Sequence, residues 1–219
     1  MVAEGKKVFI LAGPAGAGKT TFAEAIIAIN SFVLISMGQL VRHFLNTSKS
    51  PEAKKAKAMM LKGKLVPNTL SNKLLIKAFL QKAPGFILDG YPRSMPQARF
   101  LARLAKKDKW APITFIRLNI SDKDVVKRLS SRVVCPVGDE PYKLPQRICP
   151  KHKVKLVRRS DEEPKAIRER LRIYHHGIRP IEAYFAKTGR VISIKITEKK
   201  AKDQNVKVVI ETLKKNGLL

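Results

Sequence analysis

The chain alternates between short apolar runs and longer segments in which apolar residues recur every three or four positions. The first short run shows no polar alternation and is typical of a strand buried on both faces, whereas the last one alternates. Turn residues such as those at Pro84 and Gly85 separate the segments. We predict strands at residues 8–12, 32–35, 86–89, 113–118 and 190–196.

Helical spacing fills the intervals between these runs. It is clear after the first strand, where Phe22, Ala25, Ile26 and Ile29 share one face. Further helices are predicted at 40–44, 48–62, 70–78, 96–107, 122–129, 162–186 and 206–214. Strands that alternate with helices predict an α/β fold, with a doubly wound parallel five-stranded sheet flanked by helices.

Residues 133–158 break this rhythm. They contain Pro136, Pro141, Pro145 and Pro150 together with both cysteines, and they show neither strand nor helix periodicity over a useful length. We expect an inserted lobe here, not another strand–helix unit.

Residues 13–20, Gly-Pro-Ala-Gly-Ala-Gly-Lys-Thr, match the phosphate-binding loop pattern between the first strand and the first helix. Glycines let backbone N–H groups turn around a polyphosphate, and the helix dipole favours the same negative charge. Lys19 is expected to reach the β- and γ-phosphates, and Thr20 to offer its hydroxyl to Mg²⁺.

A carboxylate, Asp89, ends the third predicted strand. Ligands of open α/β sheets bind at the carboxyl ends of the strands, so Asp89 is placed to hold Mg²⁺ directly or through water.

Composition fits one α/β domain of 219 residues with 44% hydrophobic content. No apolar run approaches the ~20 residues of a membrane span, and residues 8–12 are too short for a signal-peptide core. We therefore expect a cytoplasmic protein without membrane association. Its two cysteines are expected to stay thiols or to bind metal.

Charge is the unusual feature, because 45 Lys and Arg residues against 17 Asp and Glu give a formal net charge of +28. The cations are spread over the chain and no interleaved aromatic platform accompanies them, which favours a solvated surface. Accessory binding to nucleic acid or to the ribosome remains the alternative.

Several motifs together resemble those of adenylate kinases over almost the whole chain, in order. They are the loop at 13–20, Ser36-x-Gly38-x3-Arg42, residues 64–67, residues 85–93 with Asp-Gly-Tyr-Pro-Arg, Gln97-Ala98, Arg128-x3-Arg132, Arg159-x-Asp161-Glu162 and Arg170-x3-Tyr174. The resemblance implies a core (1–35, 67–132, 159–219), a segment that binds the nucleoside monophosphate (36–66) and a lid (133–158). It also implies a monomer that transfers a phosphoryl group reversibly between ATP and AMP.

The same resemblance assigns roles to individual residues. ATP would be bound by Ala15, Gly16, Ala17, Gly18, Lys19, Thr20, Thr21, Arg128 and Arg132. AMP would be bound by Met37, Arg42, Lys64, Leu65, Val66, Gly90, Arg93, Gln97, Arg159 and Arg170. Catalysis would rest on Lys19, Arg93, Arg132, Arg159 and Arg170, whose permanently charged forks suit a phosphoryl group.

The choice of acceptor is less constrained. Gln97 follows Arg93 at the spacing found in adenylate kinases, and a carboxamide can donate and accept along an adenine edge. Met37 and Gln39 depart from the usual Thr and Asp, which weakens the polar ring expected around Mg²⁺. A kinase for UMP, CMP or GMP is the enzymatic alternative, and a nucleotide-dependent nucleic-acid or ribosome-associated factor is the alternative of another class.

The lid is a second candidate metal site. Related lids bind zinc through C-x2-C and a later C-x2-[CD], whereas this chain has Cys135 with Gly138, then Cys149 with His152. Two thiols and an imidazole suit Zn²⁺, and Asp139 is the predicted fourth ligand. The alternative is a metal-free lid in which both cysteines are small buried hydrophobes.

Overall fold

Five parallel strands form the central sheet of the computed structural model, which describes residues 5–159, 163–197 and 202–219. The strands are β1 (Lys7–Ala12), β2 (Val33–Ser36), β3 (Gly85–Asp89), β4 (Thr114–Asn119) and β7 (Arg190–Lys195). They lie in the order β2-β3-β1-β4-β7, and every pairing is parallel. The predicted five-stranded, doubly wound sheet is confirmed.

Alternate residues of each strand enter two separate hydrophobic layers. In β1, Val8 and Ile10 pack into one layer, whereas Phe9 and Leu11 pack into the other. The helices of the first layer are α2 (Met37–Thr47), α4 (Asn68–Phe79), α5 (Met95–Lys107) and α7 (Pro164–Thr188). The helices of the second layer are α1 (Lys19–Ile27) and α8 (Lys202–Lys215). Burial on both faces explains why the early strand sequences are apolar without alternation.

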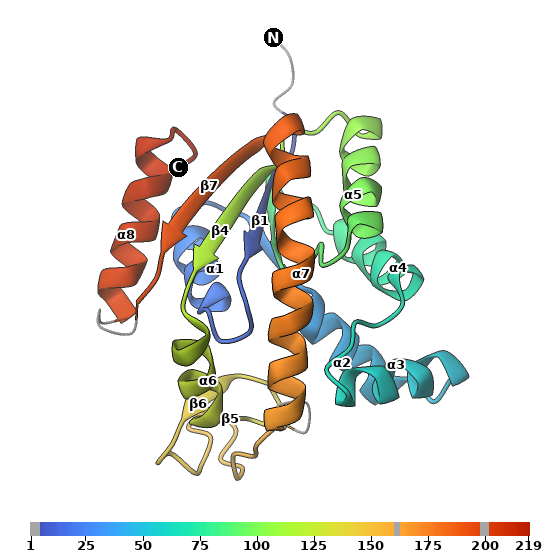
Figure 1. The fold of residues 1–219 in the computed structure, drawn as a ribbon, viewed down its shortest axis with the longest axis vertical. Coiled ribbons are helices and arrows are strands. Elements are labelled where there is room, and N and C mark those ends of the chain that lie inside the picture. Colours follow the sequence, from blue (N-terminus) through green and yellow to red (C-terminus); the bar gives the residue numbers. More distant parts are fainter. Residues whose placement is uncertain (1–4, 160–162, 198–201) are drawn as a thin grey trace.

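Two excursions leave the sheet (Figure 1). Helices α2 and α3 (Pro51–Leu61) project to one side, and α6 (Asp122–Ser130) leads to a small lobe at the bottom of the view. The long helix α7 runs from this lobe up across the sheet. Both excursions therefore begin near the carboxyl-terminal edge of the sheet, where parallel α/β folds bind their ligands.

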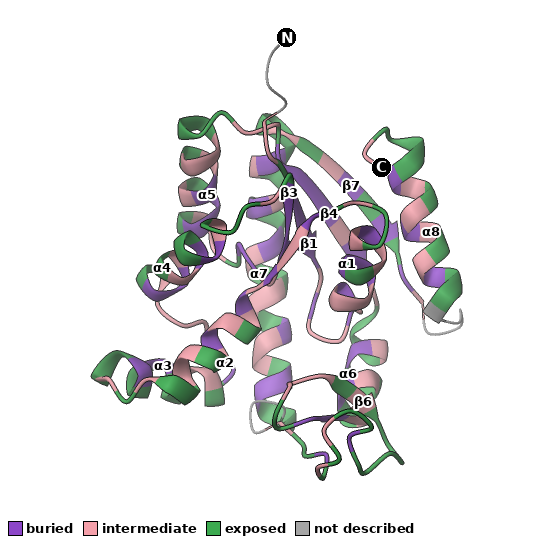
Figure 2. Ribbon diagram, turned by 180° about the vertical axis from the view of Figure 1, so that it is seen from behind, coloured by how far each residue is buried: buried purple, intermediate pink, exposed green. Residues whose placement is uncertain are grey.

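Residues 133–158, the predicted lid and called the lid lobe from here on, contain little more than one antiparallel ribbon. Strands β5 (Arg132–Val134) and β6 (Pro141–Lys143) pair, and isolated bridges join Val134 to Val157 and Ile148 to Lys155. Its hydrophobic cluster has four buried residues, Val133, Cys135, Cys149 and Leu156. Exposed and intermediate residues dominate the lobe in Figure 2.

Several element boundaries differ from the predicted ones for local reasons. The helix expected from residue 48 begins at Pro51, because the Ser50 hydroxyl accepts the N–H of Ala53 and caps it. The four-residue spacing of Arg128 and Arg132 would place them one turn apart on a continuous helix, but they belong to different elements. Helix α6 ends at Ser130, and Arg132 opens β5. Asp161 and Glu162, which belong to one of the arginine motifs, lie outside the described residues.

Candidate functional site

The loop between β1 and α1 has the backbone shape that its glycines permit. Gly16 and Gly18 have φ angles of 80° and 89°, in the left-handed region that other residues rarely adopt. Gly18 is also the N-cap of α1, so the loop delivers its backbone directly to the positive end of the helix dipole. The Ala17 side chain is fully buried and its N–H donates to the Pro14 carbonyl at 3.2 Å.

Lys19 lies inside this loop with its ammonium group held by protein oxygens. Its Nζ donates to the carbonyls of Gly13 (3.1 Å) and Pro14 (2.9 Å), and lies 3.7 Å from Asp89 Oδ1. Lys19 is only 8% exposed. Its pKa is lowered to about 8, chiefly by desolvation; the Asp89 carboxylate opposes this shift, and the guanidinium groups of Arg93, Arg170 and Arg132 add to it.

The strand register explains how Asp89 reaches the phosphate-binding loop. Asp89 pairs with Leu11 on one side and with Ser36 on the other, at the carboxyl ends of three adjacent strands. Thr20 lines the same cleft from the first turn of α1. A hydroxyl and a carboxylate at this edge are hard oxygen donors of the kind that suits Mg²⁺.

The cleft above the loop has a volume of about 660 Å³, within the range of nucleotide-sized sites. It is lined by every residue predicted to bind ATP except Ala17. Cationic side chains outnumber the two carboxylates, Asp89 and Asp139, on its described walls. The cations are Lys19, Arg42, Arg93, Arg128, Arg132, Lys143, Arg159 and Arg170. Such a wall suits a polyanion.

A smaller cavity of about 80 Å³ adjoins this cleft below α2 and the α3–α4 connection. Every residue predicted to bind AMP lines it: Met37, Arg42, Lys64, Leu65, Val66, Gly90, Arg93, Gln97, Arg159 and Arg170. The residues come from five separate stretches of the chain, which the fold brings together.

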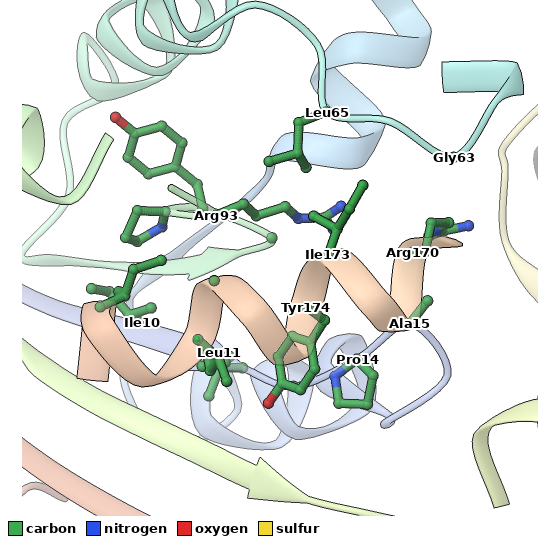
Figure 3. A pocket seen from close by; sticks show the side chains of 18 residues that line it. Ile10, Leu11, Pro14, Ala15, Gly63, Leu65, Arg93, Arg170, Ile173 and Tyr174 are labelled. Atoms are coloured by element: carbon green, nitrogen blue, oxygen red, sulfur yellow. The ribbon is translucent and has the colours of Figure 1, made fainter. Parts of the chain in front are cut away.

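Arg93 and Arg170 are placed where the cavities meet. Both line the large cleft, the small cavity and a third, largely apolar cavity of about 60 Å³ beside α7. Figure 3 shows the Arg93 side chain extending between Leu65 and Ile173, with Arg170 further along α7 toward Ala15 of the phosphate-binding loop. Two planar cations thus lie where the large cleft meets the smaller cavity.

Gln97 is tied into the protein more closely than the sequence indicates. It is 3% exposed, its Oε1 accepts the Arg93 N–H at 2.7 Å, and its Nε2 donates to Asn68 Oδ1 at 3.0 Å. Asn68 Oδ1 also accepts the Ser94 hydroxyl. Gln97 therefore fixes the backbone that carries Arg93, while its predicted contact with adenine stays a prediction.

The structure gives Asp139 a different partner from the predicted one. Its Oδ2 accepts hydrogen bonds from Nε and Nη2 of Arg42, the former at 2.8 Å, and Oδ1 lies 3.9 Å from Arg159. These contacts join the lid lobe to α2 across the cleft. Because this carboxylate faces the arginines, Asp139 is not part of the cysteine cluster, and the prediction that it completes a zinc site is wrong.

Cys135, Cys149 and His152 do form a cluster, with ligand atoms all within 4.8 Å of one another. His152 Nδ1 lies 3.3 Å from Cys135 Sγ and 3.6 Å from Cys149 Sγ. Burial opposes ionisation of Cys149, but the His152 N–H and the Tyr142 hydroxyl outweigh it and lower the pKa of the thiol to about 6. The three residues that the sequence singled out are thus brought together.

Some lining residues had no sequence signal. Ile196 and Asn205, from the end of β7 and from α8, line the far end of the large cleft, and Tyr142 and Gln146 enter from the lid lobe. Asn205 is buried, and its side chain bonds both the N–H and the carbonyl of Thr197. No local motif marks these positions, since only the sheet and lid geometry bring them to the cleft.

A phosphate-binding loop at the edge of a parallel sheet, opening on a cationic cleft with an adjoining second cavity, defines a P-loop nucleotide-binding protein. Comparison with known proteins narrows this class. Residues 11–190 match the sequence profile of the family described as adenylate kinase.

Individual relatives agree with the profile. The chain is 35% identical over 189 residues to an adenylate kinase of Petrotoga mobilis, covering 83% of this chain and 86% of the relative. It is 33% identical over 188 residues to one of Thermotoga maritima (82% and 86% covered) and 35% over 191 residues to one of Chlamydia pneumoniae (85% and 89% covered). The chain belongs to the adenylate kinase family.

Proposed function

We propose that the protein transfers the γ-phosphoryl group of ATP to AMP, reversibly, to give two ADP. The observation that carries this proposal is the junction at Arg93 and Arg170, where the donor cleft meets the acceptor cavity. Two nucleotides bound on either side would present their phosphates to the same pair of guanidinium groups. Family membership supports the same reaction.

The donor side rests on the phosphate-binding loop and its cations. Lys19 exchanges the carbonyls of Gly13 and Pro14 for phosphate oxygens, and the N–H groups of the loop surround the polyphosphate. Arg128, which donates to the Gly16 carbonyl at 3.1 Å, lies beside the loop, and Arg132 lines the cleft from β5. Positioning and charge stabilisation supply most of the catalysis in phosphoryl transfer.

The acceptor side needs no general base, because a phosphate oxygen of AMP is already the nucleophile. Arg42 and Arg93 hold the acceptor phosphate, and Arg159 and Arg170 neutralise the charge on the transferring group. On this proposal, residues 36–66 and 133–158 are the acceptor-binding segment and the lid, both closing on the core to exclude water.

Magnesium is the implied cofactor of the donor nucleotide. The oxygens of Thr20 and Asp89 would hold it, directly or through water. When bound, the ion would neutralise charge on the β- and γ-phosphates. Gln39 lines the same cleft in place of the usual carboxylate, so fewer carboxylates are available to order the water around the ion.

The test is a coupled assay of ADP formation from ATP, Mg²⁺ and each of AMP, UMP, CMP and GMP in turn. We expect AMP to give the highest kcat/KM. A higher value with another monophosphate would replace AMP as the acceptor, and absence of transfer to all four would overturn the proposal in favour of a nucleotide-dependent binding factor.

Zinc in the lid lobe is the second part of the proposal. The donors fit this ion, since Cys135, Cys149 and His152 offer two sulfurs and a nitrogen within 4.8 Å of one another. A lobe with four residues in its hydrophobic cluster gains much from a metal cross-link. Elemental analysis of protein purified without chelator tests it: about one zinc per chain is expected, and metal-free protein with an unchanged melting temperature in chelator would reject it.

The location and the partners of the protein are the last part of the proposal. Among the described residues no helix is long and apolar enough to cross a membrane. A monomeric state and a cytoplasmic location stay predictions. So does nucleic-acid association through the +28 charge, which would appear as binding that weakens steeply with salt.

A further inference from the structure

The lid lobe contains two turns with the same backbone geometry. In the first, the Asp139 N–H donates to the Cys135 carbonyl at 2.8 Å, and in the second, the Lys153 N–H donates to the Cys149 carbonyl at 2.9 Å. Asp139 and Lys153 also have φ angles of 58° and 55°, although neither is a glycine. Each turn therefore starts at a cysteine and closes four residues later in a left-handed conformation.

This equivalence pairs position 138 with position 152. The second turn presents two donors, Cys149 and His152, toward the centre of the lobe. The first turn presents Cys135, but its matching position is Gly138, which has no side chain. The two turns thus provide three ligands and one position without a ligand.

The carboxylate of Glu140 occupies the space beside Gly138. A Cβ atom built on Gly138 would lie 2.0 Å from Oε2 of Glu140 and 2.5 Å from both Oε1 and Cδ. These distances are too short for any side chain at position 138, so Glu140 adopts this position only because residue 138 is a glycine. The carboxylate lies where a ligand from the first turn would begin.

The two oxygens of this carboxylate have different surroundings. Oε1 faces the Lys151 ammonium at 3.2 Å. Oε2 is shielded from solvent, has no hydrogen-bond partner among the described residues, and lies 3.8 Å from His152 Nδ1. A buried carboxylate oxygen without a partner is costly, and a cation bound by the neighbouring sulfurs would satisfy it.

Building on the zinc proposed above, we propose that Glu140 is its fourth protein ligand, with Cys135, Cys149 and His152. Two thiolates, one imidazole and one carboxylate close a tetrahedral site with no position left for water. The Glu140 backbone is already fixed, because its carbonyl accepts the Cys135 N–H at 3.0 Å. Glu140 lies outside the group whose ligand atoms are all within 4.8 Å of one another, so its side chain must turn toward the two sulfurs to coordinate the ion.

The other nearby oxygen donors that could serve as the fourth ligand already have partners. The Asp139 carboxylate accepts a hydrogen bond from Arg42, and the Tyr142 hydroxyl lies 3.6 Å from Cys149 Sγ, one of the proposed ligands. The adjacent carboxylate therefore provides a matched control. Asp139→Asn removes the same charge one residue away, and Glu140→Gln removes the proposed ligand oxygen while it preserves side-chain size.

The experiment measures zinc affinity by competition with a chromophoric chelator for the full-length wild type, Glu140→Gln and Asp139→Asn. We expect at least a tenfold weaker affinity for Glu140→Gln, the smallest loss typical of changes around a metal site, and no measurable change for Asp139→Asn. Cobalt-substituted protein gives an independent signal. Glu140→Gln should alter the ligand-field bands while the thiolate-to-cobalt charge-transfer band, which reports the two cysteines, keeps its intensity.

A second variant tests the equivalence of the two turns. Gly138→Cys combined with Glu140→Ala removes the side chain that would collide with residue 138 and places a thiol at the position that matches His152, so it should restore tight zinc binding and add a third thiolate to the charge-transfer band. In excess chelator, the wild type and Glu140→Gln are expected to have the same melting temperature. This agreement would show that the substitution acts on metal binding and leaves the stability of the metal-free protein unchanged.

The outcomes distinguish the proposals. Equal zinc affinity and equal cobalt spectra for the wild type and Glu140→Gln would overturn the role of Glu140 and leave the three-ligand site standing. A wild type that binds no zinc would overturn both metal proposals, while phosphoryl transfer, assayed separately, would be unaffected.

Discussion

The sheet core and the lid lobe hold their shapes by different means. In the core, two layers bury large side chains such as Phe9, Phe86 and Phe115 on both faces of five paired strands. In the lid lobe, four residues form the hydrophobic cluster and two of them are cysteines. Apolar burial suffices for the first region, whereas the second depends on a polar cluster and on contacts with the rest of the chain.

The difference extends to charged groups. Lys19 in the core is buried and satisfied by carbonyls of its own loop, so the charge is held by partners close to it in the sequence. In the lid lobe, Asp139 is satisfied by Arg42 of α2, so a charge of one region is held by another. The core thus satisfies its buried charge locally, whereas the lid lobe relies on another region of the chain.

The largest effect is expected at Lys19, the cation that we propose for catalysis in the core. Lys19→Met removes the ammonium that meets the β- and γ-phosphates, and we expect kcat/KM to fall by about 10³-fold, near 4 kcal/mol. The circular dichroism spectrum should stay that of the wild type. Lys107 is exposed on α5, and Lys107→Met is the control. A similar fall in kcat/KM for both variants would show that Lys19 has no special role in catalysis.

The contrast in packing is tested by matched leucines. Leu88 is fully buried in β3, and Leu88→Ala should lower the free energy of unfolding by about 2–5 kcal/mol. Leu156 is 6% exposed in the lid lobe, and Leu156→Ala should change global unfolding by about 1 kcal/mol or less while it speeds proteolysis within residues 133–158. Urea unfolding and limited digestion measure the two. Equal losses of global stability would erase the distinction between the regions.

The next effect is expected at Arg93, where the large cleft meets the smaller cavity. Arg93→Ala removes one guanidinium group from the meeting point of donor and acceptor, and we expect a loss of about 10²-fold in kcat/KM. Arg99 is exposed on α5, the helix that follows Arg93 in the chain. Arg99→Ala is the control and should keep wild-type kinetics. An Arg93→Ala enzyme with near-normal rates would show that the junction is not where transfer occurs.

The smallest effect concerns pH and follows from the burial of Lys19 in the core. The pKa of Lys19 is about 8 in the protein without nucleotide, and phosphates favour its protonated form. Above pH 8, binding must first recover the proton, so the Kd for ATP should rise by about tenfold from pH 7 to pH 9. The nucleotide itself contributes little, since its last phosphate proton is lost near pH 6.

The same pKa sets the sign for stability. Between pH 8 and the ordinary value of 10.5, the unfolded chain binds more protons at Lys19 than the folded protein does, so this group makes the free energy of unfolding rise with pH in that window. Isothermal titration with ATP and Mg²⁺ at each pH measures the predicted change in the Kd for ATP. A Kd that stays flat across pH 7–9 would contradict the buried, desolvated environment of Lys19.

Much of the site was predictable because its signals are local. The loop at 13–20 specifies its own shape through glycines and a helix start, and Asp89 follows from its place at the end of an apolar run. The spaced arginines could be assigned to two nucleotides through resemblance, and the structure brings them to the same two cavities. The spacing of Arg128 and Arg132, however, does not reflect a shared helix, because the end of α6 is set by capping at Ser131 and by the ribbon that follows.

The amino-acid sequence by itself thus determined the five-strand fold, the phosphate-binding loop and the types of residue that surround two phosphate chains. Only the tertiary structure decided where two adjacent carboxylates point. Asp139 lies in a left-handed turn, so its side chain and that of Glu140 leave in different directions, one to Arg42 of a distant helix and one toward His152. Side-chain direction at such a turn depends on partners about a hundred residues apart along the chain, and no pattern of neighbouring residues encodes it.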